Sequence, residues 1–340
     1  MARSRRREPE VGRIDSVTHD GRGIVAGEGK KVFVAGALAG EEVRYQRRKR
    51  RRNFDEAELL EVLAPSSERV EARCAAFGRC GGCALQHVSI EQQREIKAQT
   101  LWDSLERIGK VSPGERLEPL TGEPWGYRRR ARLAVKDVPG KGRVLVGFRE
   151  RHAPFITDMD RCEVLAPPVD GMLPALSEMI GTLSIRARLP QIEVAVADNA
   201  VAFVFRVLDP PTDADLEAFR RFGETTGSQI WLQPGGLDSL ECAWPEDAPE
   251  PLVYRMPEVE VDIEFRPIDF IQVNGEINRR LVQTAVDWLE LDSGHRVLDL
   301  FSGIGNFTLP IARRAGTVHG IEGEASLVRQ AAHNAELNDL

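Results

Sequence analysis

The chain has 340 residues, 42% of them hydrophobic and 29% charged, which is enough for two or three domains that each bury a core. It has no apolar run long enough to cross a bilayer, so we expect a cytoplasmic protein with no membrane partner, whose five cysteines are metal ligands or thiols rather than disulfides. The net charge of −7 argues against nucleic acid, but residues 1–53 hold 15 Lys and Arg against 7 Asp and Glu, whereas the remainder holds 31 against 46. This separation favours a polyanionic partner for the N-terminal region.

The N-terminal region is predicted to be a basic tail followed by a small barrel. Residues 1–8 form the tail, and short valine-rich strands separated by glycine turns follow from Gly12 to about Leu63. Four or five strands at this spacing predict an all-β closed barrel of OB type. The basic run at residues 47–52 falls where two strands would meet. It is either a solvated loop or a set of phosphate contacts, and the barrel around it favours the second interpretation.

A compact cysteine segment follows the predicted barrel. Cys74, Cys80 and Cys83 have the spacing Cys-x5-Cys-x2-Cys, and two glycines between the last pair can turn both sulfurs toward one ion. A four-thiolate site needs one more ligand, and spacing leaves the choice open between Cys162 and Cys242. Zinc and an iron–sulfur cluster both accept such a site. Zinc ribbons usually have two paired knuckles, so the single pair here modestly favours a [4Fe-4S] cluster.

The central region is predicted to mix helices and strands. An amphipathic helix is expected from Ser89 to about Lys110, with its apolar face formed by Ile90, Ile96, Leu101, Leu105 and Ile108. Residues 144–149 should pair as a hairpin with the strand before them, and alternating runs near 192–196 and 200–207 precede a helix at 213–222. His87 and His152 are expected to be surface or packing residues rather than catalytic groups.

The strand from Tyr127 to Val135 is rich in arginine. Its alternation places Arg128, Arg130 and Arg132 on one face. Arginines at this spacing either bind RNA phosphates and splayed bases or form a plain solvated face, and the sequence does not separate the two interpretations.

The C-terminal region contains the order strand, Gly-x-Gly turn, helix that is typical of a nucleotide-binding crevice, at residues 297–314. Gly303 and Gly305 permit positive φ and close approach of a ligand. Thr308 stands where a dinucleotide-binding fingerprint has its third glycine, which weakens an NAD interpretation. Glu322 ends the next strand, where an acid can accept both hydroxyls of a ribose.

Two helices are predicted around these strands. The first covers residues 278–289, and the second covers residues 327–337. The apolar face of the first is expected to contain Ile277, Leu281, Ala285 and Trp288.

Residues 298–310, Leu-Asp-Leu-Phe-Ser-Gly-Ile-Gly-Asn-Phe-Thr-Leu-Pro, resemble the S-adenosylmethionine (SAM) motif of the RNA uracil-5-methyltransferase family, and residues 269–274, Asp-Phe-Ile-Gln-Val-Asn, resemble a second motif of that family. The resemblance implies a Rossmann-like class I SAM-dependent methyltransferase domain over residues 269–340. It also implies that the residues contacting SAM are Gln272, Phe301, Asn306 and Glu322, around the turn formed by Gly303 and Gly305.

The N-terminal half resembles the same family. The pattern Gly-x-Gly-Ile at residues 21–24 is similar to that of a TRAM domain, an RNA-binding barrel, here residues 9–64. In the central α/β domain, residues 65–268, the resemblance implies that Cys162 completes a [4Fe-4S] site with the three clustered cysteines. Together these features point to members that methylate C5 of a uracil in 23S rRNA, with another rRNA or tRNA uracil as the alternative. We expect a monomer.

The reaction needs groups that the sequence does not supply. Methylating C5 usually requires a thiolate that adds to C6 and a base that removes the C5 proton, and in the family both lie after the SAM motif. Two strands are also too few for a doubly wound sheet, so we expect the chain to stop within its last domain, and we assign no catalytic residue. The rival classes are a redox enzyme that uses the cluster with a nucleotide and a non-catalytic RNA-binding iron–sulfur protein.

Overall fold

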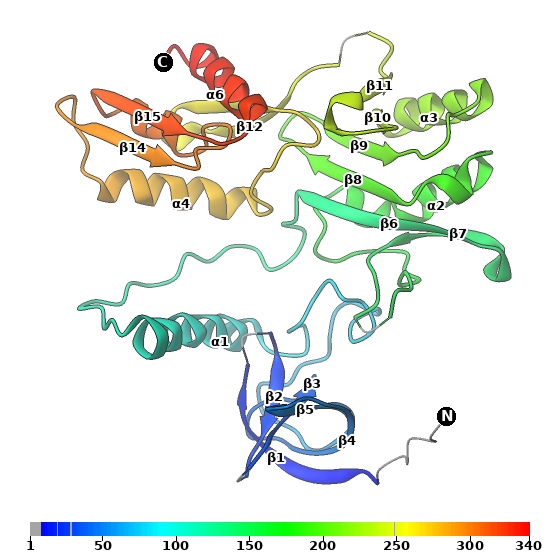
Figure 1. The fold of residues 1–340 in the computed structure, drawn as a ribbon, viewed down its shortest axis with the longest axis vertical. Helices are drawn as coiled ribbons and strands as arrows, with labels where there is room; N and C mark the ends of the chain where they lie inside the picture. Colours follow the sequence, from blue (N-terminus) through cyan, green and yellow to red (C-terminus); the bar gives the residue numbers. More distant parts are fainter. Residues whose placement is uncertain (1–7, 19, 28, 152, 248) are drawn as a thin grey trace. The chain divides into compact units, whose positions relative to one another are not determined.

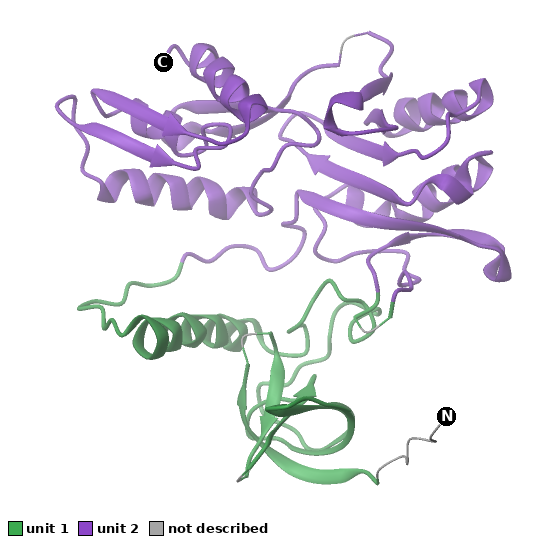
Figure 2. Ribbon diagram, viewed as in Figure 1, with its two compact units in different colours: residues 1–119, 150–153 green, residues 120–149, 154–340 purple. Residues whose placement is uncertain are grey.

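A computed structural model describes residues 8–18, 20–27, 29–151, 153–247 and 249–340, so most of the predicted basic tail and His152 lie outside the described residues. The chain divides into two compact units, residues 1–119 with 150–153 and residues 120–149 with 154–340 (Figure 2). Within the described ranges, no helix is both long enough and apolar enough to span a membrane. The domain boundaries inferred from the sequence remain a prediction.

The first unit contains a closed barrel of five strands in the order β1-β2-β3-β5-β4, drawn in blue in Figure 1. Strands β3 and β5 are parallel, and the other neighbours are antiparallel. Valine-rich alternation builds this barrel because every second side chain points to its interior. The strands are β1 (Glu10–Val17), β2 (Arg22–Val25), β3 (Lys31–Ala35), β4 (Glu42–Arg50) and β5 (Phe54–Ala64). The interior is filled by Ile14, Val32, Val34, Ala37, Val43, Tyr45 and Ala57.

Most of the basic run lies at a strand end, because β4 continues through Arg50 in antiparallel pairing with β5, and Arg51 and Arg52 follow in the turn. Arg47 donates to Glu10 and to buried Asp55, each over 2.9 Å. Hydrogen bonds from Lys30 and Arg47 lower the pKa of Asp55 despite its burial. Arg48 pairs with Glu58 across the sheet. Arg47 is therefore used within the barrel, whereas the rest of the run is exposed: Arg48, Lys49, Arg50, Arg51 and Arg52.

The helix expected from Ser89 to Lys110 is present, but its apolar face is not buried. It consists of α1 (Ile90–Asp103) and a π-helical turn (Ser104–Gly109), capped by the Ser89 side chain and ended by Lys110 in the left-handed conformation. Neither segment buries a residue. Ile96 alone of the five expected side chains packs against a small cluster of Leu38, Leu85 and Val88, while Leu101 and Ile108 are 53% and 82% exposed.

His87 is a packing residue in the first unit. It is 4% exposed, and its ring packs against Phe77 with centroids 5.3 Å apart. Burial lowers the pKa of His87 to about 4, so the imidazole is neutral at physiological pH.

The second unit begins with a six-stranded sheet in the order β11-β10-β9-β8-β6-β7. Parallel β9 and β10 are connected through α3, and the other neighbours are antiparallel. Phe203 and Phe205 on β9 pack against Phe219 and Phe222 of α3. The elements are β6 (Arg130–Val138), β7 (Arg143–Gly147), α2 (Leu173–Thr182), β8 (Gln191–Val196), β9 (Val201–Arg206), α3 (Asp213–Thr226), β10 (Gln229–Gln233) and β11 (Glu241–Trp244). Short 3-10 turns occur at Pro139–Lys141, Val169–Gly171, Arg186–Arg188, Leu237–Ser239 and Pro257–Val259.

The rest of the second unit is a hairpin followed by a parallel strand pair with its helices, drawn in yellow to red in Figure 1. The elements are β12 (Leu252–Met256), β13 (Val261–Phe265), α4 (Gly275–Trp288), β14 (Arg296–Leu300), α5 (Thr308–Ala312), β15 (Thr317–Ile321) and α6 (Ala325–Leu337). Both C-terminal strands and all three helices lie close to their expected positions.

The expected apolar face of α4 is wrong. The helix buries Asn278, Val282 and Val286, whereas Leu281 and Trp288 are 45% and 67% exposed. The three buried residues recur every four positions, so they form one stripe on the helix surface. A buried asparagine in that stripe is the signal that a purely apolar pattern misses.

Helix α6 is joined to the edge of β13 by two asparagine side chains. The Asn334 amide accepts from the backbone N–H of Glu264 and donates to its carbonyl, both over 3.0 Å, and also donates to the Ile304 carbonyl over 3.0 Å. Asn338 forms the same reciprocal pair with Asp262. Because a side-chain amide offers one acceptor and two donors, each asparagine satisfies the strand edge much as a neighbouring strand would.

Candidate functional site

The turn after β14 has the geometry that its glycines predict. Gly303 and Gly305 have φ of 56° and 101°, and Phe301 also lies in the left-handed region at 63°. A Cβ at Gly303 would meet no atom within 4 Å, so the space beside the turn is open, whereas a Cβ at Gly305 would lie 2.9 Å from Leu309. Phe301 is 88% exposed at the end of the strand. The turn therefore presents bare backbone and one aromatic ring to a ligand.

Glu322 closes the turn from the end of the neighbouring strand. One carboxylate oxygen accepts the backbone N–H of Gly303 over 3.0 Å, and the other accepts those of Gly323 and Glu324 over 2.7 and 3.1 Å. These hydrogen bonds, that of Glu324 foremost, lower the pKa of Glu322, so it stays ionised below the usual range of a glutamate. A carboxylate offers about four acceptor positions, and three are used here. Capacity remains for a ligand hydroxyl.

Asn306 is held by two residues that sequence reasoning missed. Its Oδ1 accepts from Tyr254 Oη over 3.0 Å and from the Asn278 amide over 2.8 Å, and its own amide donates back to Asn278 over 3.1 Å. Burial raises the pKa of Tyr254, so its hydroxyl stays a donor. The asparagine pair joins α4 to the glycine turn and fixes the orientation of Asn306. The sequence feature that could have revealed this pair is Asn278, a polar residue within the apolar stripe of α4.

Thr308, which replaces the third glycine of the dinucleotide fingerprint, forms a structural hydrogen bond. Its hydroxyl donates to the Asp299 carboxylate over 2.5 Å and so connects the start of α5 to β14. A third glycine would remove this connection.

The segment containing Gln272 alternates between anchoring and exposed residues. Asp269 is 4% exposed and pairs with Arg266 over 2.8 Å, and Ile271 is 5% exposed in the core. Between and after them, Phe270 is 72% exposed and Gln272 is exposed. Asn274 then caps α4 by accepting the N–H of Ile277 over 3.0 Å. The alternation presents Gln272 at the surface on a segment anchored at both ends.

The arginines of β6 are largely paired within the second unit. Arg130 donates to Glu193 over 2.8 Å and to the carbonyl of Pro267, and its side chain is only 13% exposed. Arg132 shares Glu193 but is 69% exposed, and Arg129 pairs with Asp198. The predicted alternation is present from Arg130 onward, whereas Arg128 lies before the strand and forms only isolated bridges to Leu165 and Asn274. Of Arg130 and Arg132, which share one face, Arg132 is the one accessible to a polyanion.

The cysteines form no disulfide, and all five lie within the described ranges. The Gly82 N–H points at Cys80 Sγ over 3.4 Å, Gln86 accepts the N–H of Cys74, and Arg151 donates to the carbonyl of Cys83. Cys162 belongs to the second unit. Among the described residues no three His, Cys, Asp or Glu side chains are gathered as metal ligands, so the structure gives the predicted cluster no support of its own. Cys242 is half-buried, and burial raises its pKa, as expected of a packed thiol.

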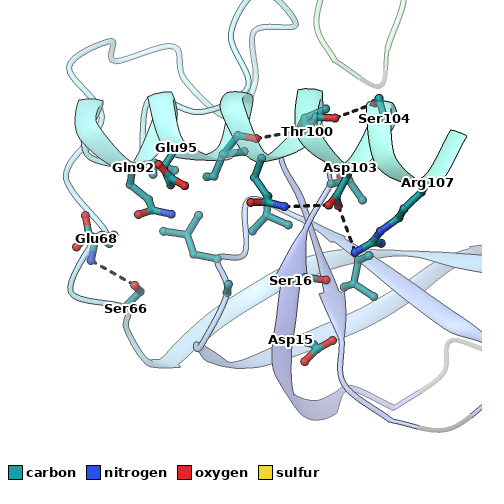
Figure 3. Close-up of a pocket in the computed structure, with 18 of the residues that line it drawn as sticks. Asp15, Ser16, Ser66, Glu68, Gln92, Glu95, Thr100, Asp103, Ser104 and Arg107 are labelled. Atoms are coloured by element: carbon teal, nitrogen blue, oxygen red, sulfur yellow. Dashed lines mark hydrogen bonds and ion pairs between the residues drawn. The ribbon is translucent and has the colours of Figure 1, made fainter. Parts of the chain in front are cut away.

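The first unit also contains a cleft of about 860 Å³ between α1 and the barrel (Figure 3). Its labelled charged side chains are mostly acidic, and the basic Arg107 is turned toward Asp103. A cleft with this charge repels a polyanion. The acidic residues that line it are Asp15, Glu68, Glu95 and Asp103.

Comparison with known proteins identifies the family to which this chain is related. Residues 255–340 match the model of the tRNA (uracil-5-)-methyltransferase family. The chain is 49% identical over 343 aligned residues to a protein of Alkalilimnicola ehrlichii named 23S rRNA (uracil(1939)-C(5))-methyltransferase RlmD, covering 100% of this chain and 77% of that protein. It is 48% identical to the protein of the same name from Aromatoleum aromaticum, covering 96% and 75%.

A solved structure has the same fold. The crystal structure of a Pyrococcus abyssi tRNA (uracil-54, C5)-methyltransferase in complex with S-adenosyl-L-homocysteine matches with a TM-score of 0.73 and 23% identity, covering 97% of this chain and 77% of that one.

Proposed function

Because the chain belongs to the RNA uracil-5-methyltransferase family, we propose that it takes part in methyl transfer from SAM to C5 of a uracil in 23S rRNA, the reaction named for its relatives. The structural observation that best supports the proposal is the hydrogen bond from the Gly303 N–H to the ionised carboxylate of Glu322. An open glycine turn with an acid at the end of the second strand suits a nucleoside with two free ribose hydroxyls.

The fit of SAM depends on the residues around this turn. When bound, SAM supplies an electrophilic methyl group. Glu322 would accept from a ribose hydroxyl with its remaining acceptor position, and the bare backbone at Gly303 would allow close approach. Phe301 and Gln272 are exposed and available to contact the cofactor, and Asn306 is oriented by its two partners.

The RNA side of the proposal rests on the first unit. A closed five-stranded barrel with a basic strand end suits a TRAM-type RNA-binding domain, and its exposed cations would contact phosphates. The target base would have to be unstacked before it could reach a methyl donor, at a cost of a few kcal/mol. We assign neither the attacking thiolate nor the base to a residue of this chain. That the protein acts as a monomer remains a prediction.

The reaction is tested by disrupting the gene in its source organism and digesting the 23S rRNA to nucleosides. The 5-methyluridine of that RNA should disappear and should return when the gene is restored. Unchanged 5-methyluridine in the 23S rRNA would contradict the proposed substrate, and loss from tRNA instead would assign the alternative one.

We also propose that Cys74, Cys80, Cys83 and Cys162 hold a [4Fe-4S] cluster. The proposal rests on the thiolate donor set and its spacing, with the Gly82 N–H directed at Cys80 Sγ as in amide-to-sulfur bonding around such clusters.

Cys80→Ser is expected to lower the iron content of protein purified without oxygen from about four atoms per chain to near zero, because a cluster of this type needs its thiolates. Cys242→Ser is the matched control and should keep both the iron and the brown colour. Iron-free wild-type protein, or zinc in its place, would contradict the cluster.

A further inference from the structure

A second cavity in the first unit, of about 460 Å³, lies against the barrel at β3 and β5. Its walls include Arg22 and Phe33 from the barrel, Gly81 and Ala84 from the cysteine segment, and Arg151. Gly21, with φ of 79°, allows the turn before β2 to approach that segment, because a Cβ there would lie 2.9 Å from Leu85. The cavity is therefore built from segments that are far apart in the chain and held in contact.

A guanidinium and an aromatic ring from the cavity wall are stacked, and a second ring packs against the first. The Arg22 guanidinium lies over the Phe33 ring, 4.8 Å from its centroid, and Phe33 meets Phe54 edge to face at 5.0 Å. Asp20 holds the guanidinium in place over 2.9 Å. Arginine planes and aromatic faces are the surfaces on which proteins stack unpaired bases, and such stacking is largely independent of base identity.

The charge around the cavity suits RNA as well. Its two carboxylates, Asp20 and Glu56, are paired with Arg22 and Arg51, so they can accept from a base edge without leaving an unbalanced negative charge. Arg51 also donates its backbone N–H to the Phe54 carbonyl, which brings the exposed basic end of β4 beside the aromatic pair. Unlike the mostly acidic cleft beside α1, the cavity wall therefore balances its carboxylates with the arginines Arg22 and Arg151.

We propose that this cavity binds one unstacked nucleotide of single-stranded RNA, with its base on the Arg22–Phe33 pair and its neighbouring phosphates on the basic strand end. The inference deepens the proposed function and rests on it. It adds that the barrel grips RNA through a base as well as through the backbone.

The test measures binding of a fluorescein-labelled RNA of ten uridines to the full chain by anisotropy at several salt concentrations. Phe33→Leu keeps an apolar side chain and removes the aromatic face, and Arg22→Lys keeps the charge and removes the plane. Stacking contributes roughly 1–3 kcal/mol per base, so Phe33→Leu should weaken binding by about 10-fold or more, and Arg22→Lys should weaken it too. Neither should change the slope of log K against log salt, because no phosphate contact is lost.

Arg52→Ala is the contrasting variant, since losing one phosphate contact should lower that slope by about 0.7. Binding of S-adenosylhomocysteine should be unchanged in all three variants, which separates this inference from the cofactor site. Equal affinity of Phe33→Leu, Arg22→Lys and wild type would overturn the inference, as would equal competition by duplex RNA of the same length. If Phe33→Leu lowers the melting temperature of the barrel, the result for Arg22→Lys decides.

Discussion

Replacing Asn334 with alanine is expected to destabilise the C-terminal part of the chain by about 2–5 kcal/mol. The side chain is fully buried, and its removal leaves the N–H of Glu264 and the carbonyl of Ile304 without this partner, whereas the Glu264 carbonyl keeps the Gln330 amide as a donor. Each unsatisfied buried backbone group costs about 1–3 kcal/mol, and water cannot reach them without opening the contact between α6 and β13. Denaturant unfolding followed by circular dichroism measures the loss.

Two further variants make the result specific. Glu336→Ala lies on the exposed side of the same helix and should change the free energy of unfolding by less than about 0.5 kcal/mol. Asn334→Asp keeps the acceptor for Glu264 but directs a carboxylate at two carbonyls, so it should be at least as damaging as alanine. A loss below about 1 kcal/mol for Asn334→Ala would show that these hydrogen bonds are replaced easily.

Replacing Glu322 with alanine is expected to weaken binding of S-adenosylhomocysteine by about 10-fold or more. A hydrogen bond from a ribose hydroxyl to a charged acceptor would be lost, and the Gly303 N–H would lose its acceptor. Glu322→Gln keeps an acceptor and loses the charge, so it should bind between the two. Isothermal titration calorimetry measures the three affinities.

The control is Glu324→Gln, which keeps an acceptor for the Ser326 N–H at the start of α6 and should bind within about twofold of wild type. The pH dependence gives a second check. Since the pKa of Glu322 is lowered, its charge persists as pH falls below the usual glutamate range, and ligand affinity should persist with it. Equal affinity of Glu322→Ala and wild type would remove the residue from the ligand site.

Much of the local structure was predictable because it depends on short-range chemistry. The valine alternation indicated the closed barrel, Ser89 and Lys110 marked the ends of one helix, and the glycines at 303 and 305 indicated the positive φ that a tight turn after a strand requires. The position of Glu322 at the end of β15 followed from the same pattern.

The partners of polar side chains were not predictable in this way. Arg47 and Arg130 look like candidates for RNA contact in the sequence, yet each is paired across a strand with an acid far along the chain. The strand register chooses those partners, and register is set by the packing of the whole sheet. The partners of Asn278 and Asn334 were not predictable either. Each side chain forms its hydrogen bonds with an amide or backbone group that only the tertiary structure brings opposite it.

The sequence by itself therefore determined where strands, turns and the acid of the glycine crevice lie, because φ preferences and the spacing of apolar residues act over a few positions. Only the tertiary structure decided which charges remain exposed, which face α4 buries, and how Arg22 stacks on Phe33 in the wall of one cavity. Such contacts join segments that are distant in the chain, and their energies depend on burial and on partner geometry that no local pattern contains.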